Sequence, residues 1–223
     1  MKEPPDSSDL SRMTLDGLEE EQHIHSAENK SWDDAFQHFF RHTQKPVSVS
    51  ASHLDLLCAT LLQIRLIALS IRLAGVMSIS ELFYDRYLSE FKKIISLARP
   101  MVGNPQSFTE GSFCFDQEFV YELVLVAFSC RDSSPCRKVI ELLGSKDWKE
   151  GTWGSRRVAD GARHMVRTEE EGAETEYIPE YSRTRLVRIE VDVERRLAHI
   201  QCVWGIAPDT VLKSDVRDQS LFY

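Results

Sequence analysis

The cysteines are the first residues of this chain to consider for chemistry, because thiolates are common zinc ligands. There are five of them, and they are scattered along the chain: Cys58, Cys114, Cys130, Cys136 and Cys202. A structural zinc site usually takes its ligands from close Cys-x-x-Cys pairs, and this sequence contains no such pair. The cysteines lie mostly within apolar patterns, which is typical of thiols that pack as small apolar side chains in a reducing compartment. We therefore predict no metal site.

Two histidines form a second candidate for metal binding. His23 and His25 make a His-x-His sequence that follows three consecutive glutamates, 19–21. Imidazole binds many transition metals, so weak metal binding is conceivable. A metal site also needs surrounding groups that hold its ligands in place, and a polar terminal segment does not supply them. We interpret this pair as an ordinary part of the polar N-terminal segment.

Arg131 and Asp132 could present an ion pair to a ligand, since they lie together in a short polar break between two apolar segments. The alternative is structural and is favoured. In that interpretation Asp132 caps the turn that follows, and Arg131 binds the carbonyl groups at the end of the preceding helix.

Arg156, Arg163 and Arg167 share one face of a predicted helix and form a basic stripe. Such a stripe could meet phosphate or an acidic partner. A solvated helix face, with nearby glutamates that neutralise the charge, is the favoured interpretation.

Motifs that would place a catalytic group are missing from the sequence. It has no Gly-x-Gly-x-x-Gly, no phosphate-binding loop, no Gly-x-Ser-x-Gly and no His-Glu-x-x-His. We therefore predict no catalytic residue, no cofactor and no enzymatic activity. Catalytic triads are assembled in space rather than in sequence, so an enzyme of unknown type stays a less favoured alternative.

The segment 115–155 must position Arg131 and Asp132, and its pattern predicts two successive helices. Apolar residues recur at helical spacing from Phe119 to Phe128. After the polar break, Ser134 is expected to be an N-cap and Pro135 a first helical residue. Gly144 is expected to end the second helix, and a turn with an aromatic residue follows.

The remaining sequence predicts a mainly α fold in which antiparallel helical hairpins form a bundle or short solenoid. Helices are expected over 31–40, 52–74, 80–101 and from residue 155 onward, the last with an exposed acidic end at 169–171. The period then changes to two, which predicts a β-hairpin at 184–204 packed on the helices. The apolar run at 54–74 contains charged residues, so a buried core helix is favoured over a membrane span.

Charge and composition divide the chain further. The net charge is −8, which argues against a direct nucleic-acid surface. The polar, acidic residues 1–30 predict a disordered tail, residues 31–206 a helical regulatory domain, and residues 207–223 a loose C-terminal tail. No apolar run opens the chain, so no secretory signal is expected.

Three short sequences in this order carry a resemblance to a known family. They are Cys130-Arg131-Asp132 at the end of an apolar helix, an arginine-containing helix from Arg137 to Leu143, and the sequence Glu150-Gly151-Thr152-Trp153-Gly154-Ser155. Together they resemble the C-terminal regulatory region of fungal zinc-cluster transcription factors, the six-cysteine binuclear type. The resemblance covers roughly residues 80–204. The family's six-cysteine DNA-binding element is missing from this sequence.

The resemblance implies a transcription regulator in the nucleus that works through protein–protein contacts, without DNA binding of its own. Its partners would be the transcription machinery or a zinc-cluster factor, and kinship implies control of a secondary-metabolite gene cluster. Leu10, Met13, Leu15 and Leu18 within the acidic N-terminal segment are compatible with contact to a coactivator. Two alternatives remain open: a module that binds a small-molecule effector between its helices, and a truncated gene product.

Overall fold

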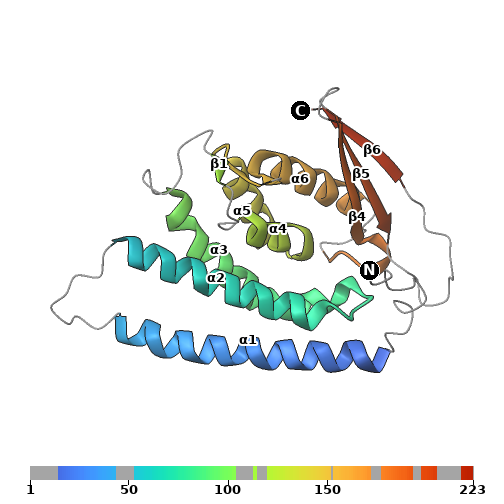
Figure 1. Cartoon of the computed structure of the whole chain (residues 1–223). Helices are drawn as coiled ribbons and strands as arrows, with labels where there is room; N and C mark the ends of the chain where they lie inside the picture. The colour runs from blue at the N-terminus through green and yellow to red at the C-terminus, as the bar shows by residue number, and fades with distance from the viewer. Residues whose placement is uncertain are drawn as a thin grey trace, which may run out of the picture. The chain divides into compact units, whose positions relative to one another are not determined.

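The computed structural model describes residues 15–43, 53–103, 113–114, 120–151, 153–171, 177–192, 197–204 and 217–222. These residues are mainly helical, which confirms the predicted class (Figure 1). The chain divides into two compact units, Met1–Ser78 and Ile79–Tyr223, rather than one helical domain over residues 31–206. The division arises because the first long helix makes its main contacts with the helix that follows it.

The first unit contains α1 (Leu15–Thr43) and α2 (His53–Gly75). The predicted tail over residues 1–30 is therefore wrong from Leu15 onward, and the helix expected at 31–40 begins much earlier. The reason is that α1 turns a mostly polar stripe toward α2. Its least exposed side chains between residues 22 and 36 recur at helical spacing, and only the last is apolar: Gln22, Ser26, Asn29, Asp33 and Phe36.

Hydrogen bonds replace apolar contacts along much of this stripe. The Gln22 side-chain amide donates to the Leu73 carbonyl oxygen at 2.6 Å, and Asn29 donates to the Ser70 hydroxyl at 2.7 Å. Asn29 is buried, so its hydrogen bond compensates for the loss of water around its amide. The later residue of α1 bonds to the earlier residue of α2, so the two helices run antiparallel.

The apolar helix α2 has the bounds that its sequence predicts, within one residue at each end. Ala68 and Ile71 are buried, whereas Leu62 and Leu69 are 47% and 43% exposed. Among the described residues, Leu56–Gly75 is long and apolar enough to cross a membrane. Length and composition alone are weak evidence for a span, because core helices of soluble proteins meet the same criteria.

The second unit begins with η2 (Glu81–Tyr87), a 3₁₀ helix, and α3 (Leu88–Gly103). The sequence predicts one continuous α-helix over 80–101, so the first two turns differ from the prediction. Ser80 caps the 3₁₀ segment by accepting a hydrogen bond from the Leu82 N–H. The Glu180 carboxylate also accepts the Glu81 and Leu82 N–H groups, both at 2.9 Å, so a distant residue holds this helix start.

The helices α4 (Val120–Ser129), α5 (Ser133–Gly144) and α6 (Ser155–Glu171) pack on one another and, together with α3, form the core of the second unit (Figure 1). Almost all of α4 is buried, as its apolar sequence predicts. The N-cap of α5 is Asp132 rather than Ser134, because the Asp132 carboxylate accepts the Ser134 N–H at 3.2 Å. The helix expected from residue 155 onward is α6, and Ser155 is its first residue.

A small sheet joins the loops around these helices. Its strands are β1 (Phe113–Cys114), β2 (Lys149–Glu150) and β3 (Trp153–Gly154), in that order. The turn between β2 and β3 contains Gly151 with φ of 55°, a left-handed conformation that favours glycine. Glu150 and Trp153 of the Glu-Gly-x-Trp sequence therefore pair as antiparallel partners.

A second sheet contains β4 (Thr184–Asp192), β5 (Leu197–Trp204) and β6 (Arg217–Phe222), paired antiparallel in that order. The strand β6 lies within the stretch 207–223 that the sequence predicts to be a loose tail, so that prediction is wrong for 217–222. Residues 207–216 lie outside the described part of the chain. The predicted packing of β4 and β5 on the helices stays a prediction, because side chains from residue 185 onward are not described.

Candidate functional site

Arg131 is the centre of the charged groups in the second unit. Its side chain is 4% exposed, and its Nε lies 2.8 Å from the Glu169 carboxylate. One terminal nitrogen donates to the Phe128 carbonyl oxygen at the end of α4, and the other donates to the Thr184 carbonyl oxygen at 2.9 Å. The Glu81 carboxylate lies 3.8 Å away. One guanidinium thus connects η2, α4, α6 and the start of β4.

Glu169 is the buried partner of Arg131. The predicted exposed acidic end at 169–171 is therefore wrong for Glu169, whereas Glu170 and Glu171 are exposed. Its side chain is 2% exposed, and it accepts the Thr184 N–H. Burial raises the pKa of this carboxyl, while the Arg131 charge acts in the opposite direction. Glu169 follows Val158, Ala162 and Met165 at helical spacing, which places it on the buried face of α6.

A second buried guanidinium, that of Arg183, lies close by. Its side chain is 1% exposed and forms a two-pronged ion pair with Asp85 at 2.7 and 2.8 Å. It also donates to the Ile178 carbonyl oxygen at 2.8 Å and to the Glu81 carbonyl oxygen at 3.1 Å. Burial acts to lower the pKa of Arg183, but the hydrogen bonds and charge of Asp85 outweigh burial and raise it. This arginine is therefore a fixed positive charge.

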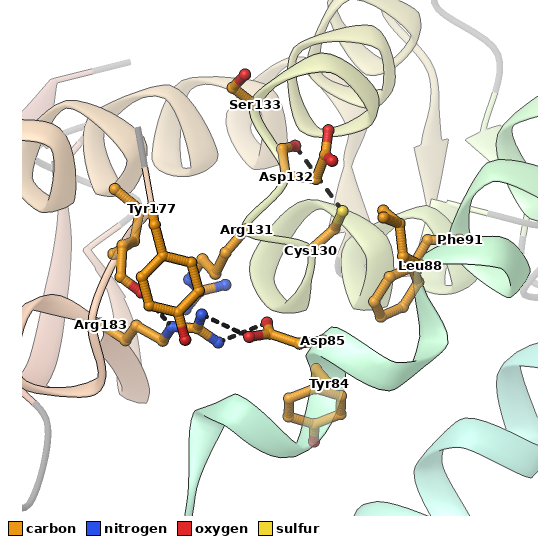
Figure 2. Close-up of a pocket in the computed structure, with 11 residues that line it drawn as sticks. Tyr84, Asp85, Leu88, Phe91, Cys130, Arg131, Asp132, Ser133, Tyr177 and Arg183 are labelled. Carbon is orange, nitrogen blue, oxygen red and sulfur yellow. Dashed lines mark hydrogen bonds and ion pairs between the residues drawn. The ribbon is translucent and has the colours of Figure 1, made fainter. Parts of the chain in front are cut away.

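These two arginines border a pocket of about 370 Å³ (Figure 2). Its size lies within the usual range for small-molecule sites, near the lower end. Figure 2 shows Asp85 directed toward Arg183, with the Tyr177 ring beside that pair and Leu88 and Phe91 on another wall. The lining combines aromatic, aliphatic and charged side chains from three separate segments: Tyr84, Asp85, Leu88, Phe91, Cys130, Arg131, Asp132, Ser133, Tyr177, Ile178 and Arg183.

The structural interpretation of Arg131 and Asp132 is confirmed. Asp132 caps α5, and Arg131 binds a carbonyl at the end of α4. The sequence does not show the further partners of Arg131, because Glu169 and Thr184 are distant along the chain. Asp85, Glu180 and Arg183 are also missing from the candidates that sequence suggests. They lie in two segments about a hundred residues apart, and no local sequence pattern indicates that they meet.

Two of the cysteines, Cys130 and Cys136, are buried in the second unit. Burial raises the pKa of the Cys130 thiol to about 11 and that of the Cys136 thiol to about 12. Within the described residues, no group of three or more His, Cys, Asp or Glu side chains is placed to hold a metal ion. The side chains of Cys114 and Cys202 are outside the description.

These pKa values predict selective alkylation. At pH 8 a thiol of pKa about 11 is ionised to about one part in a thousand. We expect iodoacetamide to modify the exposed Cys58 rapidly in the folded protein, and Cys130 and Cys136 only after denaturation. Mass spectrometry of proteolytic fragments measures each site. Rapid modification of Cys130 in the folded protein would contradict its described burial.

The histidine pair and the basic stripe lie on exposed helix faces. His23 and His25 belong to α1, and the His25 ring lies 3.1 Å from the exposed Glu28 carboxylate. Arg156, Arg163 and Arg167 are exposed on α6, and Arg163 pairs with Asp160 one turn away. Among these described side chains, the basic stripe agrees with the solvated-face interpretation.

No protein-family model, curated protein or solved structure matches this chain. Its function is therefore inferred from the chemistry of its own residues and from the sequence resemblance described above.

Proposed function

We propose that this chain is a transcription-regulator-like module that acts through protein–protein contacts, similar to the regulatory region of a fungal zinc-cluster factor. The observation that carries the proposal is the position of the residues that make up the resemblance. They lie at contacts that hold the helices of the second unit together. A sequence with the same short motifs would have the same physical reasons to fold in this way.

Each of the three motifs contributes to that scaffold. In the first, Arg131 is buried against Glu169, and Asp132 caps α5. The helix of the second motif buries Val139, Ile140 and Leu143 against its neighbours. In the third, the buried Glu150 accepts the Val120 N–H at 2.8 Å, at the start of α4. We extend the proposal to β4 and β5, whose apolar face would pack on the helices.

Ser155 completes the third motif. Its hydroxyl accepts the Trp148 N–H at 3.2 Å and donates to the Lys146 carbonyl oxygen at 2.9 Å. Trp148 is almost fully buried, and these bonds hold its backbone in the segment between α5 and α6. The motif therefore determines how the chain leaves α5 and enters α6.

The surface of α1 supports contact with a protein partner. Trp32 and Phe39 are 71% and 57% exposed, and they are seven residues apart, so they lie on one face of the helix. The helix also carries seven acidic residues against two lysine or arginine residues. Exposed aromatic side chains on an acidic helix suit a partner with an apolar groove bordered by basic residues. This helix replaces the acidic tail as the proposed contact surface.

The rest of the proposal follows from the resemblance. The module would act in the nucleus, with the transcription machinery or a zinc-cluster factor as its partner, and would control a secondary-metabolite gene cluster. It would bind no DNA by itself, which its net charge of −8 favours. It would have no catalytic activity, cofactor, metal or membrane association.

Two measurements test this function. The purified protein is expected to produce no gel shift with DNA at low salt. Fused to an unrelated DNA-binding domain, it is expected to change reporter transcription, and combining Trp32→Ala with Phe39→Ala should reduce that change by about threefold or more. The matched control combines Leu62→Ala with Leu69→Ala, an exposed apolar pair with the same spacing on α2. Specific DNA binding, or a fusion without effect on the reporter, would refute the proposal.

A further inference from the structure

The pocket of the second unit has a particular balance of hydrogen-bonding groups. Both of its guanidinium groups already donate to protein oxygens. Arg183 donates to Asp85 and to the carbonyl groups of Ile178 and Glu81, and Arg131 donates to two carbonyl groups and pairs with Glu169. The cations that line the pocket are thus largely committed to the protein. An anionic ligand would have to compete with those partners.

The carboxylates that line the pocket can accept further hydrogen bonds. Asp85 is 38% exposed, and each of its oxygens can accept a bond besides the one from Arg183. Asp132 is exposed, and the described bond to Ser134 uses only one of its oxygens. A carboxylate accepts about four hydrogen bonds in total. The unused capacity of the lining therefore favours a ligand that donates.

The charges around the pocket lead to the same conclusion. Asp85 and Asp132 balance Arg131 and Arg183 in the lining, but Glu81, Glu169 and Glu180 contact this cluster as well. Five carboxylates thus line or adjoin the pocket, against two guanidinium groups. Lys92 on α3 is a further cation near Cys130, and the balance stays negative when it is included. Such a site attracts a positive charge.

The apolar part of the lining determines the rest of the ligand. Phe91 and Leu88 form one wall, and the Tyr84 and Tyr177 rings lie near Asp85 and Arg183 (Figure 2). Aromatic faces bind flat apolar groups and also attract cations. We propose that this pocket binds a small amphipathic cation, in which an amine on a flat apolar body is attracted to the carboxylates of the lining, Asp85 and Asp132.

Such a ligand would connect parts of the chain that are far apart in sequence. It would contact the segment 84–91, the junction of α4 and α5 at 130–133, and the segment 177–183 that leads into β4. Binding would stabilise this arrangement by mass action, since the unfolded chain lacks the site. The site would make the module responsive to a metabolite. This proposal about binding does not depend on the proposed role in transcription.

Three probes that share one apolar body test the ligand class. They are 2-naphthylmethylamine, the neutral 2-naphthylmethanol and the anionic 2-naphthylacetate. With the full chain at pH 7, we expect the amine to bind with a Kd of about 1 mM or tighter. The alcohol should bind at least about fivefold more weakly, and the acetate more weakly than the alcohol. Ligand-observed saturation-transfer NMR with titration gives each Kd.

Two variants locate the binding. Asp132→Asn keeps a side chain that caps α5 but removes a charge, and we expect it to weaken amine binding about threefold or more. Tyr177→Ala removes an exposed aromatic wall and should also weaken it. Glu141→Gln removes a carboxylate from the exposed surface of α5, outside the lining, and is the matched control.

The proposal is overturned if the acetate binds as tightly as the amine, or if no probe binds at several times the expected Kd. It is also overturned if amine binding is unchanged in both pocket variants, because the amine would then occupy another place. Circular dichroism of each variant shows that it is folded. None of these outcomes depends on the reporter assay, so the two proposals can fail separately.

Discussion

Replacing Arg131 by Met is expected to lower the free energy of unfolding by about 3–5 kcal/mol. The substitution keeps an extended apolar side chain but removes the charge that pairs with Glu169. That carboxylate is 2% exposed, so water cannot replace the lost partner. The Phe128 and Thr184 carbonyl oxygens lose a donor as well. Urea denaturation, followed by circular dichroism, measures the change.

The chain offers a closely matched control in Arg137→Met. Arg137 pairs with Glu170, the residue after Glu169, at the same distance of 2.8 Å. The Arg137 side chain is 62% exposed and the Glu170 side chain is 42% exposed, so solvent screens this ion pair. Loss of an exposed pair is expected to cost about 1 kcal/mol or less. Equal effects of the two substitutions would show that Arg131 is not buried against Glu169.

The pH dependence gives a second measurement on the same pair. The folded-state pKa of Glu169 is raised, so its contribution to stability is present below its unfolded pKa and is lost as pH rises through the folded pKa. Arg131 opposes this rise, so Arg131→Met should raise the pKa further. The deficit of the variant is therefore expected to grow as pH rises above about 4.5, the ordinary pKa of a glutamate. A deficit that is independent of pH would exclude Glu169 as the cause.

A double substitution separates the lost pair from a general loss of packing. Adding Glu169→Met to Arg131→Met removes the unpaired buried carboxylate. Well-packed apolar residues often replace a buried ion pair without loss of stability. We therefore expect the double variant to be more stable than Arg131→Met alone. A double variant that is less stable would indicate that the two residues contribute independently.

The sequence predicts α4 and α5 well, because mainly apolar residues form their buried faces. The spacing from Val120 to Phe128 and from Val139 to Leu143 corresponds to the buried sides of α4 and α5. Boundaries are less accurate where a polar side chain decides them. Asp132 rather than Ser134 caps α5, since a carboxylate at that position reaches the first free N–H groups of the helix.

The sequence fails to predict α1 because the relevant face of this helix is not apolar. Gln22 and Asn29 make hydrogen bonds with α2, and hydrophobic periodicity does not detect such contacts. The same limit applies to η2, whose start is fixed by the Glu180 carboxylate some hundred residues later in the chain. Local propensity contains no information about a partner at that separation.

The sequence suggests a pocket only through one alternative function, a module that binds an effector. Its charged residues are assembled from segments far apart, with Asp85 and Arg183 separated by 98 positions. One feature of this charged cluster can be predicted from the sequence. Glu169 occupies an apolar helical face, and a charged residue in such a position requires a buried partner. That argument predicts a buried cation but does not identify Arg131.

Glu150→Ala is expected to be the second most damaging of the substitutions considered. Glu150 is 1% exposed, and its carboxylate accepts the Val120 N–H at 2.8 Å. Val120 begins α4, where the N–H groups have no partner within the helix and carry a partial positive charge. Removal of the carboxylate leaves a buried donor without that acceptor. We expect a loss of about 2–4 kcal/mol in the free energy of unfolding.

Two further variants distinguish this role from others. Glu150→Gln keeps an acceptor oxygen and should lose less than half as much stability as Glu150→Ala, because only the charge is removed. Lys149→Ala changes the exposed neighbour in β2 and should have an effect within about 0.5 kcal/mol. Hydrogen exchange at the α4 amides provides the site-specific measurement, and Glu150→Ala should accelerate it most.

If Glu150→Gln is as damaging as Glu150→Ala, the charge at the helix start matters more than the hydrogen bond. If neither variant affects α4, the glutamate of the third motif does not anchor that helix, and the scaffold argument for the resemblance loses one of its three supports.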